Sequence, residues 1–134
     1  MKRINAISII DDDPITTFGI KKMLDSLALC DTIISYTNGK LAIDGMKALI
    51  AENRPVPEII FLDINMPIMD GWQFLEEFIA LPLEQKVRIN IVTSSIDPVD
   101  TRNWEYYKAR THHLLDFKNK PIRIKDIAEI TKAA

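Results

Sequence analysis

The stretch FLDINMPIMDG, residues 61 to 71, decides how the rest of the chain is interpreted. An apolar run from Ile59 to Leu62 ends on Asp63, and a loop with two methionines, a proline, a second aspartate and a glycine follows. Burying an unpaired carboxylate costs far more free energy than leaving it in water. Asp63 therefore either ends a strand in solvent or lies at the end of a buried strand because its chemistry is needed there.

Strand-like and helix-like patterns alternate along the chain. Apolar and β-branched runs predict five strands, at residues 4–10, 32–37, 58–63, 87–92 and 114–117. Apolar residues at helical spacing follow each strand, and the fourth helix is expected to run from Pro98 to about Arg110. Five strand–helix units in strict alternation predict a parallel sheet that is covered by helices on both faces.

The composition is that of one ordinary globular domain. The 134 residues are 47% apolar and 27% charged, which is enough apolar material for a single core. The formal net charge of −2 provides no broad basic surface for nucleic acid. No apolar run has the length of a membrane span or the form of an export signal. We therefore expect one domain over residues 1–134, in the cytoplasm, that binds neither nucleic acid nor membranes.

Polar residues gather where the predicted strands end. Asp11–Asp13 follow the first strand, Asp63 ends the third, Thr93 follows the fourth, and a segment with Lys118 and Lys120 follows the fifth. In open α/β sheets, binding sites form beyond the carboxyl ends of the strands. The sequence therefore predicts a site at this edge of the sheet that contains several acids, a hydroxyl and an amine.

The acids at this edge predict a metal site. Carboxylates that lie close together raise each other's pKa, and a divalent cation relieves their repulsion. Ligands that offer only oxygen favour Mg²⁺ or Mn²⁺ over zinc, and we interpret His112 and His113 as a solvated loop pair. A carboxylate beside such a metal, with a lysine and a hydroxyl nearby, is suited to accept a phosphoryl group.

With these motifs, the sequence resembles the receiver domains of response regulators, the phosphoacceptor modules of two-component signalling. The matching motifs extend over nearly the whole chain: IDDDP at residues 10–14, LDINMPIMDG at residues 62–71, the pair Thr93-Ser94, and the pair Lys120-Pro121. The resemblance implies a flavodoxin-like, doubly wound α/β fold. Five helices would flank a five-stranded parallel sheet in the strand order 2-1-3-4-5.

The resemblance also implies which residues bind the metal and the phosphoryl group. Asp63 is similar to the aspartate that becomes phosphorylated. Asp12 resembles the acid that binds Mg²⁺ directly, and Asp11 resembles the acid that acts mainly through water. The backbone carbonyl of Asn65 is the expected third metal contact.

Three further residues correspond to the conserved lysine and the switch pair of the family. Thr93 resembles the switch hydroxyl. Lys120 resembles the family lysine better than Lys118 does, because it directly precedes a proline, and we expect the bond between Lys120 and that proline to be cis. Phe117 occupies the position of the switch aromatic residue, where tyrosine is frequent, so this chain lacks the tyrosine hydroxyl.

The function that the resemblance implies is that of a single-domain response regulator without an output domain. A histidine kinase or a histidine phosphotransfer protein would phosphorylate Asp63, and a downstream protein would recognise the changed surface. The chain, a monomer or weak dimer, would catalyse only its own phosphorylation and dephosphorylation. A phosphorelay shuttle and an unphosphorylated binding module are the alternatives. An aspartyl-phosphate phosphatase is disfavoured, because Asn65 stands where such enzymes have a second acid.

Three aromatic residues of the fourth predicted helix, Trp104, Tyr106 and Tyr107, allow two interpretations. Aromatic residues are enriched at protein interfaces, and in receiver domains this helix belongs to the usual output side. Trp104 and Tyr107 are therefore candidates for a partner surface. In the alternative interpretation, at least two of the three side chains fill the core.

Overall fold

The computed structural model of the chain describes residues 4–132, in which five strands and five helices alternate. The strands are β1 (Ile4–Ile10), β2 (Cys30–Tyr36), β3 (Ile59–Leu62), β4 (Arg88–Thr93) and β5 (Leu114–Asn119). The helices are α1 (Pro14–Leu27), α2 (Gly39–Ala51), α3 (Gly71–Ile79), α4 (Pro98–Lys108) and α5 (Ile124–Lys132). The predicted domain of residues 1–134 includes residues 1–3 and 133–134, which lie outside the described range, and its bounds stay a prediction.

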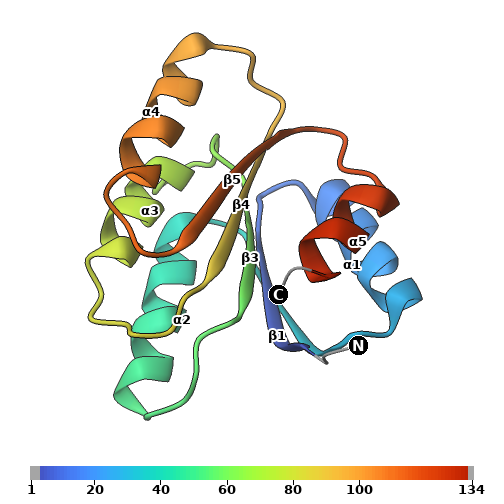
Figure 1. Cartoon of the computed structure of the whole chain (residues 1–134), viewed down its shortest axis with the longest axis horizontal. Helices are drawn as coiled ribbons and strands as arrows, with labels where there is room; N and C mark the ends of the chain where they lie inside the picture. The colour runs from blue at the N-terminus through green and yellow to red at the C-terminus, as the bar shows by residue number, and fades with distance from the viewer. Residues whose placement is uncertain (1–3, 133–134) are drawn as a thin grey trace.

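The strands form one parallel sheet in the order β2-β1-β3-β4-β5, which confirms the predicted doubly wound α/β fold. Helices α2, α3 and α4 lie on one face of the sheet, and α1 and α5 lie on the other (Figure 1). None of the helices in residues 4–132 combines the length and the apolar character that crossing a membrane requires.

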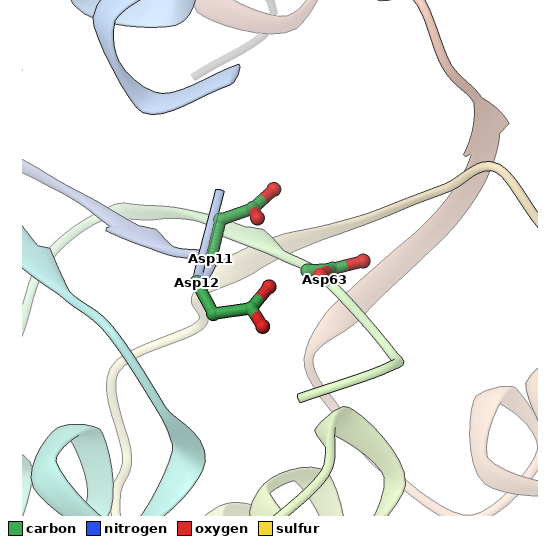
Figure 2. A group of neighbouring side chains, drawn as sticks. All are labelled: Asp11, Asp12 and Asp63. Atoms are coloured by element: carbon green, nitrogen blue, oxygen red, sulfur yellow. The ribbon is translucent and has the colours of Figure 1, made fainter. Parts of the chain in front are cut away.

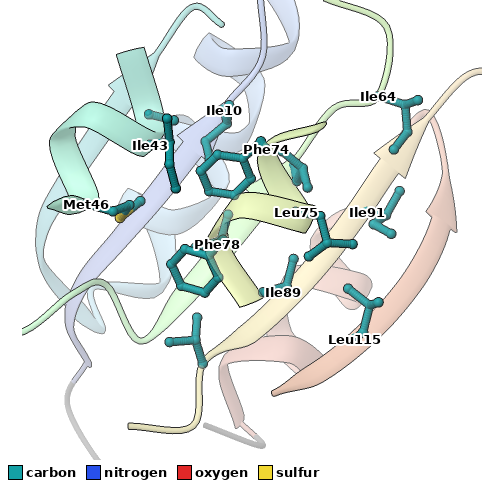
Figure 3. Packing of buried hydrophobic residues seen from close by; sticks show 14 of the residues in the cluster. Ile10, Ile43, Met46, Ile64, Phe74, Leu75, Phe78, Ile89, Ile91 and Leu115 are labelled. Atoms are coloured by element: carbon teal, nitrogen blue, oxygen red, sulfur yellow. The ribbon is translucent and has the colours of Figure 1, made fainter. Parts of the chain in front are cut away.

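The central strand β3 contributes to two apolar clusters, one on each face of the sheet. Because successive residues of a strand point to opposite faces, Ile60 and Leu62 enter the larger cluster, which α2 and α3 cover. Ile59 and Phe61 enter the smaller cluster, which α1 and α5 cover. Figure 3 shows part of the larger cluster, where the rings of α3 face the apolar residues of the sheet. A strand that is buried on both faces holds the residue that follows it in a fixed place.

Aspartates begin three of the helices, as their positions before Pro14, Gly71 and Pro98 predict. Asp13, Asp70 and Asp97 are the N-caps of α1, α3 and α4, and each accepts a hydrogen bond from a backbone N–H in the first turn. These caps fix where the helices begin, and so they fix the lengths of the loops that carry the polar residues of the sheet edge.

The predicted strand ends are wrong by up to two residues. β2 begins at Cys30 and not at residue 32, and β5 continues to Asn119 and not to residue 117. In β5 the polar residues Lys118 and Asn119 pair with Val92 and Thr93 of β4. Backbone pairing does not depend on side-chain polarity, so a polar strand end looks like a loop in the sequence. α4 also ends earlier than predicted, at Lys108.

His113 is buried, so the prediction of a solvated histidine pair is wrong for this residue. Its Nδ1 accepts a hydrogen bond from the backbone N–H of Val87 (3.0 Å), and its ring centroid lies 5.2 Å from that of Phe78. Burial, together with the charge of the neighbouring His112, lowers the pKa of His113 to about 4. His113 is therefore neutral near pH 7 and belongs to the core, whereas His112 is exposed.

Candidate functional site

The predicted polar residues meet at the carboxyl edge of the sheet because neighbouring strands end there. Asp63 directly follows β3, and its backbone N–H donates a hydrogen bond to the carbonyl of Ile10 at the end of β1 (2.8 Å). In the same way, the N–H of Asp11 donates to the carbonyl of Tyr36 at the end of β2 (3.0 Å). These two hydrogen bonds extend the strand pairing by one residue and place the side chains of Asp11 and Asp63 beside each other.

Asp11, Asp12 and Asp63 form a cluster of carboxylates (Figure 2). Each offers one oxygen, and these oxygens all lie within 4.8 Å of one another. Asp11 and Asp63 are buried, with 5% and 6% of their surface exposed, whereas Asp12 is exposed. A backbone N–H orients each buried carboxylate: that of Asp13 donates to Asp11 Oδ1 and that of Ile64 donates to Asp63 Oδ1, both at 2.9 Å.

Lys120 supplies a positive charge to this cluster. Its Nζ lies 3.1 Å from Asp11 Oδ2 and 3.6 Å from Asp63 Oδ1. Burial by itself would lower the pKa of Lys120, but the hydrogen bond and charge of Asp11, with the charge of Asp63, raise it above its ordinary value. The bond between Lys120 and Pro121 is cis, as expected. Lys118, the competing candidate, lies within β5 opposite Val92.

The electrostatics of Asp63 fit a bound cation. Burial, together with the charges of Asp11 and Asp12, raises the pKa of Asp63 to about 6, although the charge of Lys120 and the hydrogen bond from the Ile64 N–H act in the opposite direction. The donors are carboxylate oxygens without a histidine or thiolate, which is the set that Mg²⁺ and Mn²⁺ prefer. Asn65, whose carbonyl is the expected further contact, lies in the exposed loop two residues after Asp63.

Thr93, the predicted switch hydroxyl, is fully buried at the end of β4. Its Oγ1 accepts a hydrogen bond from the backbone N–H of Ser95 (3.0 Å), and its carbonyl accepts one from the N–H of Lys120 (2.8 Å). Phe117, the predicted switch aromatic residue, is partly buried in β5, opposite Ile91. Thr93 therefore connects the loop after β4 with the loop that carries Lys120.

The three aromatic residues of α4 lie in different surroundings. Trp104 and Tyr107 are partly buried and pack against the larger core cluster, whereas Tyr106 is 52% exposed. The ring of Tyr107 stacks on that of Trp72 in α3, with a centroid distance of 5.9 Å. Two of the three thus pack on the core, which is the second of the two interpretations. The partner surface at Trp104 and Tyr107 stays a prediction.

Sequence reasoning did not identify how closely Gly71 packs against the site. A Cβ at Gly71 would collide with the backbone carbonyl of Asp63, and the N–H of Gly71 donates to the carbonyl of Ile64 (2.8 Å). The start of α3 is therefore pressed against the residue that precedes the exposed loop. The sequence signal was a glycine directly after a helix-capping aspartate.

Three isoleucines near this edge were also missed. Ile15 in the first turn of α1, Ile68 in the loop after β3, and Ile96 in the loop after β4 are 80%, 82% and 93% exposed. Ile68 also has a φ of 76°, in the left-handed region that a β-branched residue rarely adopts. Each isoleucine lies in or beside a loop that follows a site-bearing strand, so all three lie toward the carboxyl edge of the sheet.

Comparisons with known proteins agree with the fold and the motifs. The model of the response regulator receiver domain family matches residues 7–132. A two-component response regulator of Oryza sativa subsp. indica is 31% identical over 121 residues, which are 90% of this chain and 15% of that protein. An uncharacterized response regulatory protein of Staphylococcus epidermidis is 33% identical over 117 residues, 87% of this chain and 41% of that protein. This chain thus spans less than half the length of either relative.

The fold is also similar to that of solved structures. The crystal structure of a two-component response regulator from Cytophaga hutchinsonii matches with a TM-score of 0.82 and 28% sequence identity. The match covers 98% of this chain and 97% of the other. The resemblance inferred from short motifs therefore extends to the whole described fold.

Proposed function

Because this chain belongs to the response regulator receiver domain family of two-component signalling, we propose that it is a phosphoacceptor and that Asp63 is the residue phosphorylated. Receiver domains are signalling phosphoacceptors and not classical enzymes, and they interact with histidine kinases or phosphotransfer proteins. The observation that carries the assignment to Asp63 is its position. It is a buried carboxylate with two further carboxylates within 4.8 Å and the Lys120 ammonium at 3.6 Å.

Receiver domains bind Mg²⁺ at an acidic pocket, and the cluster of this chain fits that role. Asp12 and Asp63 would hold the ion directly, Asp11 would act mainly through water, and the carbonyl of Asn65 would complete the protein ligands. When bound, the cation supplies positive charge that offsets the repulsion of the carboxylates and the charge of the phosphoryl oxygens.

Four residues of the chain have separate roles in the phosphoryl transfer and the change that follows it. The ionised carboxylate of Asp63 attacks the phosphorus of a partner's phosphohistidine. An O–P bond forms, the N–P bond breaks, and the imidazole nitrogen keeps the electron pair. Lys120 stabilises the transferring oxygens by its charge. The hydroxyl of Thr93, whose oxygen accepts a hydrogen bond from the Ser95 N–H, then donates one to a phosphoryl oxygen, and the Phe117 ring moves toward Thr93.

The exposed isoleucines support a protein as the phosphodonor. Ile15, Ile68 and Ile96 each expose a large apolar side chain in a segment that follows a site-bearing strand, where it is available to pack against a protein partner. The strained backbone of Ile68 also supports a functional role for this segment, because strained residues cluster at functional sites. We propose that these side chains contact the protein that presents the phosphohistidine.

Mass spectrometry after incubation with Mg²⁺ and acetyl phosphate tests the assignment. The wild-type chain should gain one phosphoryl group, and Asp63→Asn should gain none. Asp70→Asn is the matched control, because it removes a carboxylate from the same loop while asparagine still caps α3. The assignment fails if Asp63→Asn is phosphorylated as well as the wild type is.

A further inference from the structure

Helix α4 is joined to β5 by one tryptophan. Among the residues of α4, all of which are described, Asp100 is the only one that is buried. Trp104 is partly buried, and its Nε1 donates a hydrogen bond to the backbone carbonyl of Leu115 in β5 (2.9 Å). The ring of Trp104 lies against that of Phe117, with a centroid distance of 5.9 Å and an angle of 45° between the ring planes. One side chain thus holds both the strand and the predicted switch ring.

A second tryptophan joins the same helix to α3. The Nε1 of Trp72 donates to Asp100 Oδ1 (3.0 Å), and the Trp72 ring stacks on that of Tyr107. The two indoles therefore make matched attachments, each with one hydrogen bond and one aromatic contact. Only the attachment through Trp104 includes Phe117.

We propose that Trp104 is a positioning residue that holds Phe117 in its resting place and so limits how readily the domain accepts a phosphoryl group. This inference rests on the proposed function of Asp63 as the phosphoacceptor. It assigns Trp104 a role inside the molecule, in contrast to the partner contact that the sequence predicted for it.

The direction of the effect follows from the contacts. Phe117 lies opposite Ile91, two residues before Thr93 in β4, whereas Trp104 is bonded to Leu115, two residues before Phe117 in β5. A ring that moves toward Thr93 therefore moves along the sheet, away from the place where Trp104 is attached. Phe117 has no hydroxyl, and packing alone holds its ring. An aromatic contact and a net hydrogen bond together change a two-state equilibrium by about tenfold or more. Trp104 therefore favours the resting state.

In the shifted state of the domain, the Phe117 ring has moved toward Thr93. A ligand that prefers this state binds with an apparent affinity that is reduced by the small population of the state. Loss of the Trp104 contacts increases this population. The domain should then accept a phosphoryl group faster from a small donor and bind a phosphoryl analogue more tightly.

The experiment compares Trp104→Leu, Trp104→Phe and the matched control Trp72→Phe. Initial phosphorylation rates are measured by mass spectrometry with Mg²⁺ and acetyl phosphate, and apparent affinities are measured for beryllofluoride. Trp104→Leu should increase both by about tenfold. Trp104→Phe keeps a ring but loses the hydrogen bond, so it should increase both by about threefold. Trp72→Phe should leave both unchanged, although it also loosens α4.

Three results would overturn the inference. Trp104→Leu could accept the phosphoryl group at the wild-type rate or more slowly, or Trp72→Phe could accelerate it equally. The third result concerns Trp72→Phe, in which Trp104 is the remaining tryptophan. The fluorescence of Trp104 could stay unchanged when this variant is phosphorylated. Should Trp104→Leu not fold, Trp104→Phe and this fluorescence decide. A wild-type chain that gains no phosphoryl group would instead contradict the proposed function.

Discussion

Asp63 and His113 are both buried titratable side chains, and they lie at opposite ends of the parallel sheet. At the carboxyl end, Asp63 lies near two other carboxylates, and burial together with their charges raises its pKa to about 6. At the amino end, His113 accepts a hydrogen bond from Val87 and packs on Phe78, and burial lowers its pKa to about 4. Each pKa shift keeps its group closer to neutral, but Asp63 lies beside two carboxylates and the Lys120 ammonium, whereas the charged neighbour of His113 is His112.

The difference shows that burial of a titratable group does not by itself indicate function. The surroundings of His113 favour the neutral ring at neutral pH, so the histidine contributes to packing. The surroundings of Asp63 leave a repulsion between carboxylates that a cation could relieve, and the loop after it contains the strained Ile68. The carboxylate repulsion and the backbone strain at the carboxyl end of the sheet both oppose folding. We therefore assign function to the carboxyl end.

The largest effect on stability should come from the amino end. His113→Ala removes a ring that packs on Phe78 and leaves the Val87 N–H without its acceptor, so it should lower the free energy of unfolding by about 3 kcal/mol. Urea unfolding at pH 7 measures this, with the exposed His112→Ala as the control that should change it by less than about 0.5 kcal/mol. If His113→Ala also lost affinity for Mg²⁺, the amino end of the sheet would contribute to metal binding as well as to stability, which would contradict the distinction between the two ends.

Asp12→Asn should weaken metal binding and leave the stability of the fold unchanged. Asp12 is exposed, so the substitution should leave the fold stable, but it removes one negative charge from the metal site. Mg²⁺ affinity, measured by calorimetric titration, should fall on the order of a hundredfold. Unchanged affinity would show that the cation, if it binds, binds elsewhere.

The two ends should also give opposite pH dependences in the metal-free protein. The pKa of Asp63 is higher in the folded chain than its ordinary value of 3.8, so this group adds stability as the pH falls from about 6 to 4. The pKa of His113 is lower in the folded chain than its ordinary value of 6.5, so its contribution is lost as the pH falls from about 6.5 to 4. Over its full pH range each contribution is about 3 kcal/mol.

Unfolding by urea at pH 7 and pH 4.5, in the presence of a chelator, separates these contributions. Relative to the wild type, Asp63→Asn should lose more stability between the two pH values, because only the His113 contribution remains. His113→Gln should lose less or gain. If both variants keep the pH dependence of the wild type, the two pKa shifts do not control stability in this range.

The smallest effect should come from the strain at Ile68. Asparagine tolerates a φ of 76° better than a β-branched residue does, and the side chain is 82% exposed, so Ile68→Asn loses little packing. The free energy of unfolding should rise by about 0.5–1 kcal/mol. Phosphorylation by acetyl phosphate should stay at the wild-type rate, since Ile68 is assigned to contact with a protein donor. A less stable variant would mean that the isoleucine is not strained.

The sequence predicted the fold and the acidic cluster because both depend on local patterns and topology. Asp11, Asp12 and Asp63 directly follow apolar strands, and parallel strands bring their carboxyl ends to one edge. Lys120 was preferred to Lys118 because of the adjacent proline, and its Nζ does lie next to Asp11. The strand order came from the resemblance and not from the pattern of residues.

The features that the sequence did not predict depend on contacts between distant residues. The partner of His113 is Val87, and that of Asp100 is Trp72, each more than 25 residues away. A histidine before a strand looks solvated unless the N–H that it accepts from is known. The inward position of Trp104 likewise depends on a carbonyl of β5, which the spacing along α4 does not reveal.

We expect the acids at the carboxyl edge of the sheet to make Asp63 the phosphoacceptor. This expectation is tested most directly by locating the phosphoryl group after reaction with Mg²⁺ and acetyl phosphate. Borohydride reduction of the acyl phosphate, digestion and peptide sequencing by mass spectrometry identify the modified residue. We expect the label on Asp63, and we expect it to be lost when Mg²⁺ is chelated. A label on Asp11, on Asp12 or on a histidine would contradict this assignment.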